Sequence, residues 1–211
     1  YSVSWSPDGR RLASGSYDNT IGIWNATTGE LEQTLEGHTG EVSSVSWSPD
    51  GRLLASGSLD KTIGIWNAAS GQRIQTLKGH TSSVNSLSWS PNGRLLASGS
   101  WDDTIGIWNV ATGELEKTLK DHTGEVNSVR WSPDGRRLAS GSGDHTVRIW
   151  NAATGEREQT LKGHAQSVFS VSWSPDGLRL ASGSFDNTIG IWNAATGERE
   201  QTLKGHAQSV F

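Results

Sequence analysis

The sequence predicts an all-β protein built from five similar units, each with four short antiparallel strands. Two series of tryptophans recur every 42 residues, and no insertion or deletion interrupts the repeat. Within a unit, apolar and polar residues alternate with the period of two that is typical of strands. Glycine or proline interrupts every segment long enough for a helix. We therefore expect one repetitive domain over residues 1–211, with repeats 1–42, 43–84, 85–126, 127–168 and 169–210.

The order of motifs in the second repeat shows how the four strands follow one another. The first strand alternates through SVSWS (44–48), and the following PDG forms a turn. The second strand is RLLASGS (52–58), and a tight turn at Asp60 leads into the third, TIGIWN (62–67). The segment AASGQ turns the chain into a fourth strand through QTL. A lone sheet of this size cannot bury both faces, so the units are expected to stack on one another.

Composition and charge exclude several classes of function. The formal net charge is −4 and there is no basic run, which argues against a nucleic-acid partner. No apolar stretch reaches membrane-spanning length and nothing resembles a secretory signal, so no membrane partner is expected. Cysteine is absent, which excludes disulfides but leaves the compartment open, with the cytoplasm favoured.

Two features of the chain as a whole point to its origin. It begins at Tyr1 and contains no methionine, which indicates a piece of something longer. Residues 150–169 and 192–211 are identical, which indicates recent duplication or deliberate construction.

The unit resembles the WD-repeat (WD40) β-propeller unit, and the resemblance covers the whole chain. Its marks are a Gly-His pair (37–38, 79–80, 163–164 and 205–206), then SPDG, LASGS, an aspartate and a tryptophan ending the third strand. The chain departs from the family pattern where Asp121 replaces the glycine before His122, and where asparagine follows the tryptophan. The resemblance implies a β-propeller of five blades, similar to recently amplified repetitive propellers.

The resemblance also implies a hydrogen-bonded network of His, Ser, Asp and Trp in each blade. The sets are His38–Ser56–Asp60–Trp66, His80–Ser98–Asp102–Trp108, His122–Ser140–Asp144–Trp150 and His164–Ser182–Asp186–Trp192. The first blade has Ser14, Asp18 and Trp24, and the histidine of matching phase is His206, at the far end of the chain or in a neighbouring molecule.

Hydrolases also combine serine, histidine and aspartate, so an enzyme is the alternative interpretation of these sets. A catalytic site is needed once, however, whereas this set recurs in every unit beside a tryptophan whose N–H needs a buried acceptor. The histidines occur once per blade and far apart, unlike metal ligands. We therefore expect no enzyme, no metal site and no cofactor.

The residue before the network aspartate differs in all five repeats. In a meander, the turn that holds this aspartate and the loop that follows each histidine lie on the same face, where the resemblance implies that partners dock. Drift of surface positions is the alternative, but the turns of the opposite face vary less. The variable positions also include tyrosine, tryptophan and phenylalanine, which anchor interfaces. The expected partner-binding residues are Tyr1, Tyr17, Leu59, Trp101, Phe169, Phe185, Phe211, Glu41, Glu125, Asn85 and Asn127.

The sequence therefore predicts a non-enzymatic scaffold that recognises a protein or peptide on its top rim. The alternative is an engineered or amplified repeat protein with a structural role and no dedicated ligand. WD-type blades usually assemble in sevens, and five would have to turn about 72° each rather than about 51° to close a ring. We expect a homo-oligomer, with a two-chain ten-bladed ring as the simplest form, or part of a longer array. A strained five-bladed monomer is the rival.

Overall fold

The computed structural model describes residues 2–210, which form twenty β-strands and no helix. The strands make five sheets of four, and within each sheet neighbours in sequence are neighbours in space. Every pairing is antiparallel, so each sheet is a simple meander, which we call a blade. The sequence-based prediction of an all-β propeller with five four-stranded antiparallel blades is confirmed. Tyr1 and Phe211 lie outside the described residues.

The bounds of the strands repeat from blade to blade with small differences. Blade 1 contains β1 (Ser2–Trp5), β2 (Arg11–Gly15), β3 (Ile21–Asn25) and β4 (Leu31–Leu35). Blade 2 contains β5 (Val42–Trp47), β6 (Leu53–Ser58), β7 (Thr62–Asn67) and β8 (Arg73–Lys78). Blade 3 contains β9 (Val84–Trp89), β10 (Leu95–Ser100), β11 (Thr104–Asn109) and β12 (Leu115–Lys120). Blade 4 contains β13 (Val126–Trp131), β14 (Arg137–Ser142), β15 (Val147–Asn151) and β16 (Arg157–Leu161). Blade 5 contains β17 (Val168–Trp173), β18 (Arg179–Ser184), β19 (Thr188–Asn193) and β20 (Arg199–Lys204).

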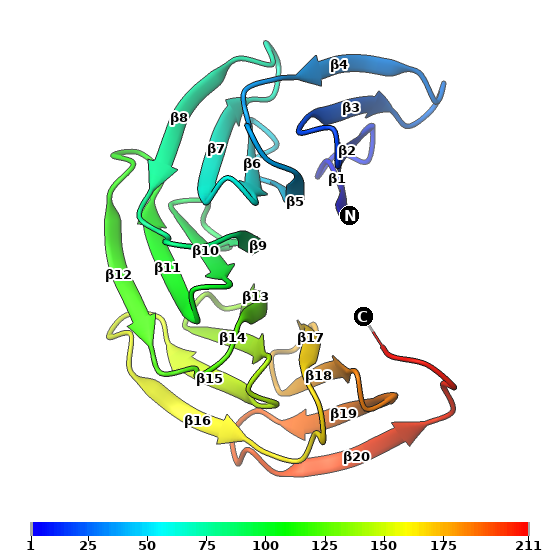
Figure 1. Cartoon of the computed structure of the whole chain (residues 1–211), viewed down its shortest axis with the longest axis vertical. Helices are drawn as coiled ribbons and strands as arrows, with labels where there is room; N and C mark the ends of the chain where they lie inside the picture. The colour runs from blue at the N-terminus through cyan, green and yellow to red at the C-terminus, as the bar shows by residue number, and fades with distance from the viewer. Residues whose placement is uncertain (1, 211) are drawn as a thin grey trace.

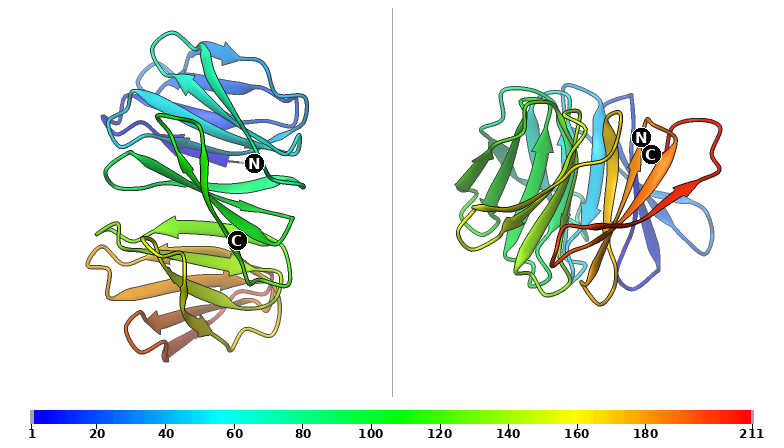
Figure 2. Two further views of the ribbon diagram at one scale, coloured as in Figure 1. Left: turned by 90° about the vertical axis from the view of Figure 1, so that its left-hand side faces the viewer. Right: turned by 90° about the horizontal axis from the view of Figure 1, so that it is seen from below.

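The blades stand side by side in an open arc, with the first strand of each blade innermost and the fourth outermost (Figure 1). The strands run from one face of the arc to the other, so the turns of all blades gather on two opposite faces (Figure 2). The arc does not close, because an opening separates blade 1 from blade 5 (Figure 1).

The tight turn between the second and third strands depends on an unusual backbone conformation. The residue after the network aspartate has a φ of 65–71° in every blade, although none of the five is glycine. These residues are Asn19, Lys61, Asp103, His145 and Asn187. Asparagine and aspartate tolerate this left-handed region best, because their short polar side chains bond to the local backbone.

The hydrophobic core lies between blades, in four clusters that each join two neighbours. In the first cluster, Ile23 and Leu35 of blade 1 pack with Val45 and Trp47 of blade 2, and all four are at most 7% exposed. Burying an aliphatic side chain of this size contributes about 1.5–3 kcal/mol, so each junction is a substantial source of stability. Glycine permits the close approach, since a Cβ at Gly57 would lie 2.8 Å from Cγ1 of Val84 in the next blade.

Candidate interaction face and the polar networks beneath it

A chain of hydrogen bonds links tryptophan, serine, histidine and aspartate in blade 3. The Trp108 indole N–H donates to Ser98 Oγ at 2.7 Å, and Ser98 Oγ lies 2.7 Å from His80 Nε2. His80 Nδ1 lies 2.9 Å from Asp102 Oδ2. Because the indole can only donate and the carboxylate can only accept, the network is satisfied when Ser98 donates to Nε2 and Nδ1 carries the proton. With the proton on Nδ1, every donor and acceptor along this series of hydrogen bonds has a partner.

Blades 2, 4 and 5 hold the same chain of contacts. Their Nδ1–Oδ2 distances are 2.8, 2.6 and 2.8 Å, and their serines are at most 1% exposed. The four sets predicted from the sequence therefore lie together in space. In each set the serine hydroxyl is buried and hydrogen-bonded on both sides, as buried polar groups in folded proteins usually are.

Electrostatics favours the same protonation states. Burial lowers the pKa of His38, His122 and His164, and the hydrogen bond from each ring to its aspartate only partly opposes this. Burial alone would raise the pKa of Asp60, but hydrogen bonds from Thr62, His38 and the Thr39 backbone outweigh it and lower the pKa to about 2. These shifts favour neutral His38, His122 and His164 and a charged Asp60 at neutral pH.

Blade 1 is the exception, because no histidine contacts its serine within residues 2–210. Trp24 still donates to Ser14 Oγ at 2.8 Å, but Trp24 is 37% exposed, whereas Trp66, Trp108 and Trp192 are 1% exposed. His206, which has the matching phase, is exposed. The C-terminal end of the chain lies across the opening from blade 1 (Figure 1). The set of blade 1 is therefore incomplete in the single chain.

The aspartate turn of each blade meets the loop that leads into that blade, and together they form one face, which we call the top rim. In blades 2 to 5, a backbone N–H of the aspartate turn donates to a backbone carbonyl of this loop at 2.8–3.0 Å. The donor and acceptor pairs are Leu59 and Glu41, Trp101 and Ser83, Gly143 and Glu125, and Phe185 and Ser167. The network aspartate adds a second link, since the Thr81 backbone N–H donates to Asp102 at 2.8 Å. In blades 2 to 5, the residue before the network aspartate thus stands on a doubly anchored turn.

The predicted rim residues divide into two groups. On the rim itself, Tyr17, Trp101 and Phe185 are 68%, 47% and 37% exposed. Leu59, Glu41 and Glu125 accompany them at the equivalent turns and loops of blades 2 and 4. Gly143 leaves no gap beside Glu125, because a Cβ there would lie 2.8 Å from the Glu125 carboxylate.

The second group lies on the inner strands. Asn85, Asn127 and Phe169 line a polar cavity of about 490 Å³ together with serines of β5, β9 and β13. Asn127 donates to the Val168 carbonyl of the next blade at 3.2 Å, so this side chain bridges two blades. Phe169 packs against Phe185 with ring centroids 4.1 Å apart, which connects the cavity to the rim. Tyr1 and Phe211, which were expected to join this group, lie outside the described residues.

Comparison with known families identifies the repeat. Residues 1–113, more than half of the chain, match the family model described as the IFT122 first beta-propeller. Residues 113–151 and 155–193 match the model described as WD domain, G-beta repeat. The chain belongs to the WD40-repeat propeller family.

Individual proteins match short stretches of the chain. A probable cytosolic iron-sulfur protein assembly protein 1 of Cryptococcus neoformans is 70% identical over 23 residues, which are 11% of this chain and 5% of that protein. The U5 small nuclear ribonucleoprotein 40 kDa protein of Dictyostelium discoideum is 48% identical over 40 residues, 19% of this chain and 11% of that protein. The WD repeat-containing protein VIP3 of Arabidopsis thaliana is 49% identical over 43 residues, 20% of this chain and 13% of that protein. The chain thus spans a small part of the length of these relatives.

Blade 4 departs from the WD40 pattern in a way that sequence reasoning missed. Arg148 stands where the other blades have glycine, and its guanidinium lies 3.3 Å from both Asp121 and Asp144. Asp121 also pairs with Arg157 at 2.5 Å. The sequence could have indicated this pairing, because Asp121 and Arg148 are both departures from the repeat. Both occur where the loop before His122 meets the third strand of its blade. The two departures from the repeat pattern are therefore in contact with each other.

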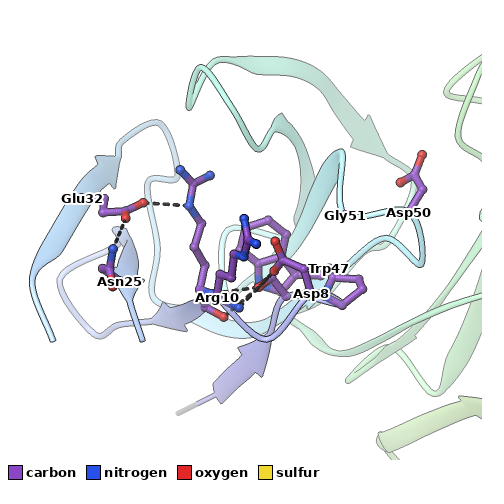
Figure 3. A pocket seen from close by; sticks show the side chains of 10 residues that line it. Asp8, Arg10, Asn25, Glu32, Trp47, Asp50 and Gly51 are labelled. Carbon is purple, nitrogen blue, oxygen red and sulfur yellow. Dashed lines mark hydrogen bonds and ion pairs between the residues drawn. The ribbon is translucent and has the colours of Figure 1, made fainter. Parts of the chain in front are cut away.

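A second pocket, of about 590 Å³, lies on the opposite face between the SPDG turns of blades 1 and 2 (Figure 3). Asp8 and Asp50 belong to these turns, and Trp47 and Arg10 form other parts of the wall. The Glu32 carboxylate is already engaged, since it accepts from Arg11 at 2.7 Å and from Asn25 at 2.9 Å. This pocket lies among turns whose sequence hardly varies between WD40 repeats of the chain.

Residues 2–210 hold no cluster of three or more His, Asp or Glu side chains arranged to bind a metal ion. The same range has no helix long and apolar enough to cross a membrane.

Proposed function

We propose that this WD40 chain is a non-enzymatic scaffold that binds a protein or peptide on its top rim. One observation carries the proposal: the residue before the network aspartate changes in every blade, while the network below it keeps the same residue types. Three of these residues are large aromatics that are 37–68% exposed. Exposed aromatic side chains are costly to leave in water and are the residues that anchor interfaces.

The anchoring of the turns supports recognition by a rigid surface. Trp101 directly precedes Asp102, whose carboxylate accepts hydrogen bonds from Thr81 and Thr104. A side chain on such a turn loses little conformational freedom when a partner binds. One position can therefore change from blade to blade without disturbing the fold.

The chemistry of the rim favours a particular kind of partner. Glu125 is exposed beside Gly143, and Glu41 bonds through its backbone to the turn of Leu59. A partner with apolar or aromatic anchors flanked by lysine or arginine would complement this mixture of aromatic and acidic groups. We propose a segment of this composition as the ligand.

The proposal includes no catalytic activity and no cofactor. Ser98, which supplies the hydroxyl group of the blade 3 set, is fully buried and bonded to both Trp108 and His80. The alternative of a purely structural repeat array gains no support from the WD40 matches. We further propose that the chain associates with additional blades, either as a two-chain ten-bladed ring or as part of a longer array.

The test begins with a peptide-display selection against the chain, followed by binding titrations of one selected peptide. Replacing Trp101 or Phe185 with alanine is expected to weaken binding about 30-fold or more, because truncating an anchor typically costs about 2 kcal/mol. Thr112→Ala, on an exposed turn of the opposite face, is the matched control and is expected to change neither binding nor melting. Selected peptides that bind all three variants equally would contradict the proposal, as would a marked fall in the melting temperature of the rim variants.

A further inference from the structure

The first end of the arc exposes side chains whose equivalents are buried or partly buried at the internal junctions. Val3 and Trp5 of blade 1 are 75% and 59% exposed, whereas the residues 42 positions later, Val45 and Trp47, are 4% and 7% exposed. Trp5 also lacks a bond that three of its four equivalents make, since Trp47, Trp89 and Trp173 donate to carbonyls of the preceding blade. Blade 1 thus presents one complete half of a blade junction.

The other end of the arc presents the complementary half. Leu203 of β20 is 43% exposed, whereas its equivalents Leu161 and Leu119 are 1% and 5% exposed. At the internal junctions this leucine packs in one cluster with the valine and tryptophan of the next blade, as Leu35 does with Val45 and Trp47. The exposed face of blade 5 is therefore complementary to the exposed face of blade 1, because each carries the residue types that pack together at the internal junctions.

The C-terminal segment already has the conformation that this junction needs. Residues 192–211 have the same sequence as 150–169, the segment that carries His164 onto blade 5. Val210 donates its backbone N–H to Ser184 at 3.0 Å, as Val42 does to Ser16 at 3.0 Å. Gly205 has a φ of 156°, close to the 147° of Gly163. The segment is therefore preorganised for docking.

The polar half of the junction is equally prepared. Ser14 accepts the Trp24 indole N–H at 2.8 Å, and in the other blades the serine hydroxyl meets a histidine at 2.7–2.8 Å. Asp18 already accepts hydrogen bonds from Thr20, as Asp186 does from Thr188. The hydrogen-bonded set of blade 1 has no histidine, and His206 is exposed and has no serine and aspartate beside it.

We propose that the outward face of blade 1 is a docking site for the C-terminal face of a second copy of this chain. Leu203 of one copy packs on Val3 and Trp5 of the other, and His206 joins Ser14 and Asp18 to complete the network of Trp24. This inference deepens the proposed homo-oligomer and does not depend on the ligand of the top rim.

The geometry favours a second copy over the chain's own end. The two ends do not meet in the arc (Figure 1). Closure of a ring by one chain requires each blade to turn by about 72° from its neighbour, which is about 21° more than in a seven-bladed ring. A ring of ten blades requires a turn of about 36° between neighbours, which is about 15° less than in a seven-bladed ring. Two copies form both junctions at once, which gives a closed two-fold ring with no exposed end.

Light scattering on the purified 211-residue chain tests the proposal, with Val3→Asp and Leu203→Asp as the two face variants. We expect the wild type to have the mass of two chains, and each variant at the same concentration to have the mass of one. Because each variant retains one intact face, an equimolar mixture of the two is expected to regain two-chain species. His206→Ala is expected to raise the dissociation constant about tenfold or more. Lys204→Ala is the matched control, since the equivalent residues are exposed at every internal junction.

Several results would overturn the inference. A wild-type chain that remains a monomer at micromolar concentration would exclude the second copy as the occupant of this face. Dissociation by only one of the two aspartate variants would indicate that like faces pair, and a mixture that stays monomeric would contradict the head-to-tail arrangement. Peptide binding by the same variants reports separately on the top rim, so failure of one proposal is distinguishable from failure of the other.

Discussion

Replacing Asp102 with alanine tests the role of the polar network most directly. Its carboxylate accepts bonds from His80 Nδ1 at 2.9 Å, from the backbones of Thr81 and Thr104 at 2.8 and 3.1 Å, and from the Thr104 hydroxyl at 2.6 Å. Alanine leaves all of these donors without their acceptor, and the chain through Ser98 to Trp108 loses its charged end.

The burial of the site sets the size of the effect. The side chains of His80 and Asp102 are only 4% and 9% exposed, so water cannot readily replace the lost acceptor for the imidazole. The Thr81 backbone lies at the exposed edge and can be rehydrated. Counting one to two stranded donors at about 1–3 kcal/mol each, we expect the free energy of unfolding to fall by about 2–4 kcal/mol. For a chain of this length, that lowers the melting temperature by roughly 4–16 °C.

The neighbouring residue provides a matched control in a thermal melt followed by circular dichroism. Asp103 has a φ of 65°, and asparagine occupies the same position in blades 1 and 5. Asp103→Asn therefore removes a charge without changing the backbone preference, whereas alanine would add strain of about 1–2 kcal/mol in the left-handed region. If Asp102→Ala and Asp103→Asn melt at the same temperature, the network does not stabilise the blade and the reasoning is wrong.

Two further predictions concern the charged groups. Asp121→Gly is expected to lower the free energy of unfolding by about 1–3 kcal/mol, because it removes one of the two partners of the buried Arg148. In melting experiments, adding Arg148→Gly should recover most of that loss. Additive losses would refute the coupling between the two residues. Acid should destabilise the chain in two stages in urea titrations. The lowered pKa of His122 means that the unfolded chain binds the extra proton, so stability falls as pH drops below about 6.5. The lowered pKa of Asp60 adds a second loss between about pH 4 and pH 2, and stability independent of pH from 7 to 4 would contradict the histidine assignment.

The sequence predicted the repeat, the strand order and the residues that share each network, because these depend on periodicity and on buried polar groups that need partners. It did not reveal the left-handed residue after each aspartate, since Lys61 and His145 give no local signal for that conformation. The pairing of Arg148 with Asp121 was also missed, because a repeat comparison treats each departure from the pattern separately.

The distinction between rim and inner cavity could not be predicted either. Asn127 and Phe169 follow the loop after the histidine by the same count of residues, yet Asn127 bonds to the next blade while Phe169 packs on Phe185. Asn127 reaches a backbone carbonyl of the next blade, whereas Phe169 meets the residue before the aspartate in its own blade, and the strand pattern indicates neither partner. The opening of the arc likewise depends on the angle between blades.

The separation of the core into four junctions has a consequence for how the chain folds. The principal contacts between strands join elements of one blade or of adjacent blades, so they stay within one repeat or two neighbouring repeats of the sequence. Short loops close quickly and at small entropic cost, so folding is expected to begin at any junction and to spread in both directions. Four nearly equivalent nuclei then compete, and two that start apart must meet in matching register. A chain of such similar units reaches its final arc by several parallel routes rather than along one ordered sequence of steps.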